Sequence, residues 1–101
     1  MIVIEKNAGP KIPYEVTGTK ITFDDDLMLN LGKRQGDEPV HIDICSNSAH
    51  QLITGTQDAR AFVAQIDIPP REYTEPETEE EAPEPLPLDM EKVVLTLWAV
   101  A

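Results

Sequence analysis

Two segments in the middle of the chain alternate between apolar and polar residues with a period of two, as half-buried strands do. In residues 40–45, one side of an extended chain would hold Val40, Ile42 and Ile44, and the other His41, Asp43 and Cys45. In residues 60–68, one side would hold Phe62, Ala64, Ile66 and Ile68, and the other Ala61, Val63, Gln65 and Asp67. We therefore expect two strands that each turn one face towards a core, the second ending before Pro69-Pro70.

The first third of the chain predicts a hairpin and one ambiguous segment. Residues 12–16 and 21–23 place apolar side chains at alternate positions, and Gly18 between them can adopt the positive φ of a tight turn. Residues 27–31 alternate as a strand does, although the three aspartates at 24–26 could instead cap a short helix. We favour a strand there, paired as a hairpin with residues 40–45, and a third hairpin between residues 52–54 and 60–68.

Both ends of the chain are more continuously apolar. Ile2–Ile4 and Val93–Val100 carry apolar side chains at nearly every position, which is typical of strands covered on both faces. Short strands separated by polar turns predict an all-β fold. We expect one domain over residues 1–101, built as a small antiparallel sandwich or barrel of seven to eight short strands.

Residues 71–89 differ in composition from the rest of the chain. They contain eight acidic residues and one basic residue, a net charge of −7 out of −11 for the whole chain, and six prolines lie between positions 69 and 87. Such a segment has little apolar surface with which to offset the loss of chain entropy on folding. We expect a flexible acidic Pro/Glu-rich loop inserted before the C-terminal strand, and the sequence leaves open whether that strand pairs within its own chain.

Charge and cysteine content limit the partners. An acidic chain is repelled by phosphate backbones and anionic headgroups, so we expect no direct nucleic-acid or membrane binding, and a protein partner, if charged, should be basic. The strongly apolar segment 93–101 is only nine residues long, about half the ~20 needed to span a bilayer. With a single cysteine and no signal-like N-terminal segment, we expect a cytoplasmic protein or part of an intracellularly assembled particle.

Two groups of residues could carry chemistry. His41, Asp43 and Cys45 should share a strand face, and His50 could fold back towards them, so zinc binding or a Cys-His nucleophile is conceivable. A solvated outer face is the simpler interpretation, because zinc sites usually draw ligands from two places in the chain. Asp24–Asp26 lack the glycine and terminal glutamate of a calcium loop, and we expect a solvated turn, with neither metal nor other cofactor bound.

These observations favour a non-enzymatic structural or protein-interaction module, a small subunit of a larger assembly such as a phage-type particle. A first alternative is an acidic binding protein or inhibitor that engages a basic partner through residues 72–89. A second is a small metal-dependent or Cys/His enzyme. The candidate interaction residues are Trp98, Glu79, Glu80 and Glu81, although for Trp98 we favour a position in the core.

Overall fold

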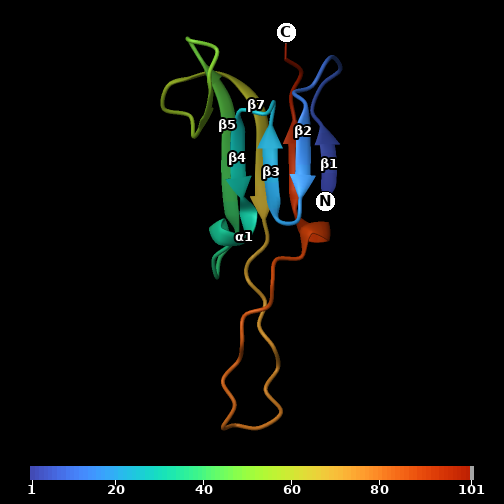
Figure 1. Ribbon diagram of the computed structural model, residues 1–101, viewed down its shortest axis with the longest axis vertical. Coiled ribbons are helices and arrows are strands. Elements are labelled where there is room, and N and C mark those ends of the chain that lie inside the picture. The colour runs from blue at the N-terminus through green and yellow to red at the C-terminus, as the bar shows by residue number, and fades with distance from the viewer. Residues whose placement is uncertain (101) are drawn as a thin grey trace.

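Eight short strands form two sheets that pack face to face in the computed structural model, which describes residues 1–100 (Figure 1). The strands are β1 (Ile2–Glu5), β2 (Tyr14–Thr17), β3 (Lys20–Phe23), β4 (Leu27–Asn30), β5 (Val40–Asn47), β6 (Leu52–Thr54), β7 (Ala59–Ile68) and β8 (Val94–Leu97). One helical turn, α1 (Leu31–Arg34), and a 3-10 turn (Met90–Lys92) complete the regular structure. The predicted all-β class is confirmed, and within residues 1–100 the sheets form two layers rather than a closed barrel.

The larger sheet has the strand order β1-β8-β7-β5-β6. The C-terminal strand β8 pairs within its own chain, antiparallel to β7 and parallel to β1. Leu95 and Leu97 of β8 are buried, as its apolar sequence predicts. Among the strand pairs of residues 1–100, β1–β8 is parallel and all the others are antiparallel, as expected for an antiparallel sandwich.

The smaller sheet is a meander with the order β2-β3-β4. Gly18, with φ 61°, makes the two-residue turn between β2 and β3 that the sequence predicts. Asp24 and Asp25 also have positive φ, 52° and 51°, and the Asp26 N–H donates to the Phe23 carbonyl over 2.9 Å to close the turn into β4. The three aspartates therefore form a turn.

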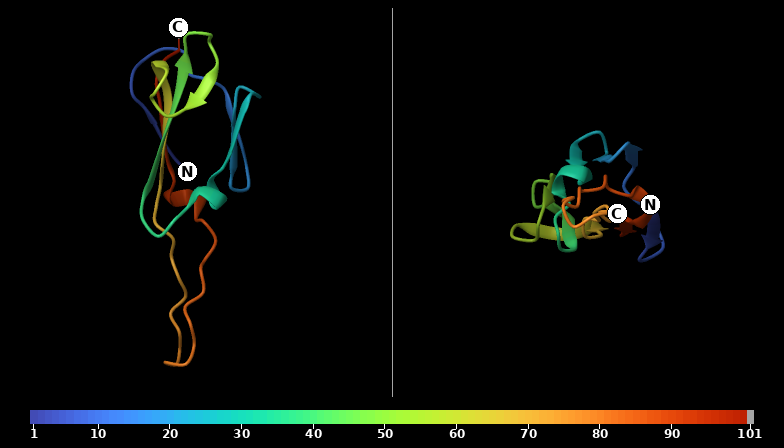
Figure 2. Two further views of the ribbon diagram at one scale, coloured as in Figure 1. Left: turned by 90° about the vertical axis from the view of Figure 1, so that its left-hand side faces the viewer. Right: turned by 90° about the horizontal axis from the view of Figure 1, so that it is seen from below.

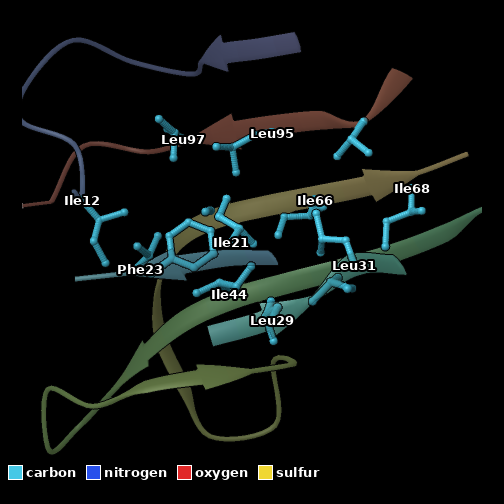
Figure 3. Close-up of a cluster of buried hydrophobic side chains, with 14 of the residues drawn as sticks. Ile12, Ile21, Phe23, Leu29, Leu31, Ile44, Ile66, Ile68, Leu95 and Leu97 are labelled. Carbon is cyan, nitrogen blue, oxygen red and sulfur yellow. The ribbon is translucent and has the colours of Figure 1, made fainter. Parts of the chain in front are cut away.

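Apolar side chains from the facing sides of both sheets make one core (Figure 3). The larger sheet contributes Ile42, Ile44, Ala64, Ile66, Ile68, Leu95 and Leu97, and the smaller sheet with its neighbours contributes Ile12, Ile21, Phe23, Leu29 and Leu31. Among these, Ile21, Phe23, Leu31, Ile44 and Ile66 are fully buried.

Two of the predicted hairpins are wrong, although the strands themselves exist. The strand at 27–30 pairs with β3 instead of β5, because Asn30 caps the single turn α1 by accepting a hydrogen bond from the Lys33 N–H, and the chain then crosses to the other sheet. The strand at 52–54 pairs with β5 instead of β7. The long strands β5 and β7 pair with each other along most of their length, which leaves the three-residue β6 at the outside.

The acidic segment 71–89 leaves the sandwich as a two-legged extension between β7 and β8, which we call the acidic arm (Figure 2). Its legs are joined by hydrogen bonds from the Thr74 N–H to the Glu84 carbonyl, 2.9 Å, and from the Leu86 N–H to the Glu72 carbonyl, 2.8 Å. The arm gives the molecule its elongated shape of 56 × 25 × 21 Å.

Candidate interaction surfaces

One extra residue in β7 controls the outer face of the larger sheet. Ile44 pairs with Ala64 and Cys45 pairs with Phe62, so Val63 is unmatched and forms a β-bulge. Beyond this bulge the phase of β7 changes: Val63 is buried and Phe62, which the sequence assigned to the core face, is 42% exposed. The prediction for Phe62 is therefore wrong, because a simple alternation cannot register an inserted residue.

Phe62 packs on Trp98 at the surface. The two rings are stacked with centroids 5.4 Å apart and an interplanar angle of 27°. Trp98 is half-buried against Phe62, so the favoured position in the core is wrong. Its backbone N–H donates to the Val63 carbonyl, 3.0 Å. Cys45 on β5 lies beside Phe62, and Ile53 on β6 lies beside Cys45, because these residues are paired in the sheet. Aromatic pairs of this kind occur at protein interfaces, so Trp98 remains a candidate interaction residue.

Cys45 is fully buried, which contradicts the expected solvated face. Burial raises the pKa of the Cys45 thiol, and the negative charge of Asp43 raises it further. Both effects disfavour the thiolate, which is the form that attacks electrophiles and binds metals. The position is suited to packing between Ile53 and Phe62.

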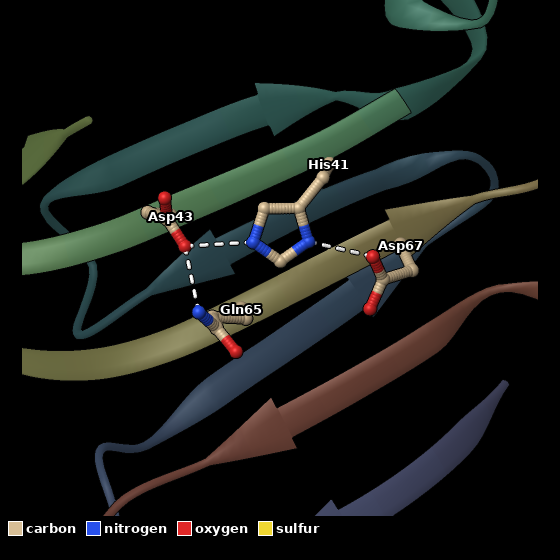
Figure 4. Close-up of polar contacts among 4 residues, drawn as sticks. All are labelled: His41, Asp43, Gln65 and Asp67. Carbon is tan, nitrogen blue, oxygen red and sulfur yellow. Dashed lines mark hydrogen bonds and ion pairs between the residues drawn. The ribbon is translucent and has the colours of Figure 1, made fainter. Parts of the chain in front are cut away.

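His41 bridges two carboxylates on the outer face (Figure 4). Its Nδ1 lies 2.6 Å from Oδ1 of Asp67, and its Nε2 lies 2.8 Å from Oδ1 of Asp43. The Gln65 amide donates to the same Asp43 oxygen, 2.8 Å. The hydrogen bond to Asp67, followed by that to Asp43, raises the pKa of His41. Because both ring nitrogens face acceptors, the protonated imidazolium, which donates from both, fits this geometry best.

Of the residues proposed for a Cys/His or metal site, His41 and Asp43 are in contact, and His50 lies away from His41. His41 lies near the start of β5 and His50 follows its end, and the six residue steps from His41 to Asn47 alone span about 20 Å along the strand. Within residues 1–100, no group of three His, Cys, Asp or Glu side chains could hold a metal ion. The possibility that His50 joins His41, Asp43 and Cys45 in a metal site is therefore not supported by residues 1–100.

The acidic arm is anchored at its base. Arg71 donates from its N–H to the Gly36 carbonyl, 2.8 Å, and from its guanidinium to the Gln35 carbonyl, 2.7 Å. The Tyr73 hydroxyl donates to Asp37, and the Lys92 ammonium donates to Glu72, 2.7 Å. Beyond these contacts the side chains at 75–84 are exposed, including Glu79, Glu80 and Glu81 at the far end. The arm therefore presents its charge away from the sandwich.

Strand β1 forms an open edge of the larger sheet (Figure 1). Ile2, Val3 and Ile4 are 52%, 44% and 46% exposed, so the prediction that this strand is covered on both faces is wrong. The Ile2 N–H donates to the Val93 carbonyl and the Lys6 N–H to the Leu97 carbonyl, both 2.8 Å. The backbone N–H and C=O groups of Ile2 and Ile4 therefore point towards β8, and those of Val3 and Glu5 point away from it, towards solvent. The sequence could not reveal that β1 is an edge strand, because a central strand and an exposed apolar edge strand both consist of consecutive apolar residues.

Comparison with protein families, curated proteins and solved structures found no match to this chain. Within residues 1–100, no helix is long and apolar enough to cross a membrane.

Proposed function

We propose that the protein is a non-enzymatic interaction module, a small subunit of a larger assembly, which binds an extended segment of a protein partner along β1. The open β1 edge is the observation that carries this proposal. A strand added there would pair with the outward N–H and C=O groups of Val3 and Glu5, and would cover apolar side chains that water now contacts.

The side chains of β1 offer contacts on both faces of such an added strand. Val3 pairs in register with the core-facing Leu95, so it lies on the inner side of the sheet, and Ile2 and Ile4 lie on the outer side. Natural proteins usually protect exposed edges with charged residues, proline or bulges. Residues 2–4 contain none of these, whereas the opposite edge of the sheet is the short strand β6. An edge left apolar in this way supports a binding role.

A random library of short peptides tests this function without a known partner. Val3→Pro removes an outward N–H that no strand within residues 1–100 uses, and it places a ring where an added strand would pair. Val16→Pro on β2 is the matched control. The Asp24 N–H donates to the carbonyl of Pro13, just before β2, so the backbone groups of residues 15 and 17 face β3 and those of Val16 face outward.

Peptides selected on the wild-type protein should bind Val16→Pro equally and lose binding to Val3→Pro. Circular dichroism would verify that both variants remain folded. Peptides that bind all three proteins alike, or a selection that yields none, would contradict strand addition at β1.

The acidic arm supports a second candidate function, the binding of a basic protein partner. The arm extends as two hydrogen-bonded legs and places Glu79, Glu80 and Glu81 far from the sandwich, where a partner can reach them. Binding by such a segment would be electrostatic and would weaken with salt.

A lysine-rich peptide serves as the probe for the arm. Changing Glu79, Glu80 and Glu81 to Gln should reduce its affinity several-fold, whereas changing Asp24, Asp25 and Asp26 to Asn, which removes the same charge elsewhere, should have a smaller effect. Equal effects of the two triple substitutions would show that only net charge matters, and would contradict specific binding by the arm.

A further inference from the structure

We infer that the segment bound along β1 is the β1 strand of a second copy of this chain, antiparallel to the first, with the two-fold axis passing beside Ile4. This inference rests on the proposed function and names its partner. The pairing would join two larger sheets into one continuous sheet across a symmetric dimer.

The outward backbone groups select the register. Only Val3 and Glu5 within β1 direct their N–H and C=O groups away from β8. An antiparallel copy uses both residues of both strands when Val3 lies opposite Glu5 of the second copy. Centring the axis on Val3 would leave Glu5 opposite residue 1, and centring it on Glu5 would place two like charges face to face.

The side chains agree with this register. Ile4 lies opposite its own copy on the outer face, as a closely spaced pair without direct hydrogen bonds between the two residues. Ile2 lies opposite Lys6, whose aliphatic stem can cover it while the ammonium stays in water. The contact therefore covers apolar surface that water contacts in the monomer, where Ile2 is 52% exposed and Ile4 is 46% exposed.

Charge favours the antiparallel orientation. The acidic arm, with a net charge of −7, leads into the start of β8, and β1 runs parallel to β8. The arm therefore extends from the end of the sandwich where β1 begins (Figure 1). Antiparallel pairing sends the two arms to opposite ends of the dimer, far beyond the Debye length of about 10 Å, whereas parallel pairing would place them side by side.

Disulfide trapping tests the register directly. Residues opposite each other without direct hydrogen bonds have Cα atoms about 4.5 Å apart, within the range that a disulfide spans. Ile4→Cys should form a covalent dimer under mild oxidation. Ile2→Cys and Lys6→Cys should each form no covalent dimer alone and should form one when the two variants are mixed. The wild-type protein is the control, because its single cysteine, Cys45, is buried and should not cross-link.

Sedimentation measurements separate failure of this inference from failure of the proposed function. The wild-type protein and Val16→Pro should dimerise with rising concentration, and Val3→Pro and Ile4→Lys should remain folded monomers. A wild-type monomer that still binds library peptides in a Val3→Pro-sensitive way would overturn the second copy as partner and leave strand addition standing. A monomer that binds no peptide would overturn both, and a dimer in which Ile4→Cys does not cross-link would overturn this interface.

Discussion

Single residues decide what the outer face of the larger sheet offers. The unmatched Val63 turns Phe62 outward onto Trp98 and leaves Cys45 covered, so the surface there is apolar and aromatic. A few residues away, His41 joins Asp43 to Asp67 in a polar cluster. Sequence alternation predicted the outward positions of His41 and Asp67, and it failed at Phe62 because no residue type marks a bulge.

The His41 bridge should make stability depend on pH. Its raised pKa means that the bridge contributes fully below the unfolded-state value of 6.5 and is lost as pH rises through the folded-state value. Relative to His41→Asn, the wild-type protein should be more stable at about pH 6, by no more than about 1 kcal/mol for such an exposed cluster, and the difference should shrink towards about pH 9. Urea unfolding at several pH values measures it.

The double variant His41→Asn, Asp67→Asn isolates the contact. The coupling energy between the two positions should fall with rising pH as the imidazolium loses its proton. A coupling that is flat with pH, or that grows towards alkaline pH, would contradict the imidazolium bridge.

The turn between β3 and β4 should be open to stabilisation. Asp24 and Asp25 both have positive φ, a conformation that Asn-Gly adopts at lower cost. Replacing the pair by Asn-Gly should stabilise the protein by about 1 kcal/mol, or raise Tm by roughly 4–8 °C for a domain of this size. Gly18→Ala is the control in the opposite direction and should lower Tm. An added Cβ would meet no atom within 4 Å, so the loss of stability would come from the backbone strain of alanine at φ 61°. An unchanged or lower Tm in the Asn-Gly variant would contradict a strained turn.

The strands themselves were largely predictable, and their partners were not. Alternation at 40–45 and 60–68 marks β5 and β7 because each has one face in the core. The partner of a strand depends on which neighbour buries more surface, and this cannot be read from the strand alone. Residues 27–30 thus pair with the preceding strand, β3, and not with the following strand, β5. Likewise β1 and β8 are both apolar, yet β1 is an edge strand and β8 lies between two strands.

The acidic arm should divide into a rigid base and a mobile end. Arg71 and Tyr73 are held by the loop at 35–37, and Leu88 is buried, so these residues should have backbone order parameters close to those of β7. The residues at 77–82 lie beyond the hydrogen bonds that join the legs to each other near Thr74, and should be flexible on the nanosecond timescale. NMR relaxation tests both expectations, and uniform order along 71–89 would contradict the division.

Taken as a whole, the molecule separates its charge from its apolar edge. The acidic arm carries most of the net charge at one end, and β1 runs along the side of the sandwich as an apolar edge strand that pairs with β8 on one side only. Composition predicted the acidic segment, because prolines and glutamates are visible in any sequence. The β1 surface could not be predicted in the same way, because Ile2–Ile4 would look identical in the centre of a sheet.

Amide hydrogen exchange at β1 tests the central claim most directly. The N–H groups of Ile2, Ile4 and Lys6 should be protected at every protein concentration, because they face β8. Those of Val3 and Glu5 should exchange rapidly in dilute protein and become protected as the concentration rises and the edge pairs. Fast exchange at Val3 and Glu5 at all concentrations, with no protection from added peptide, would contradict an edge built for strand addition.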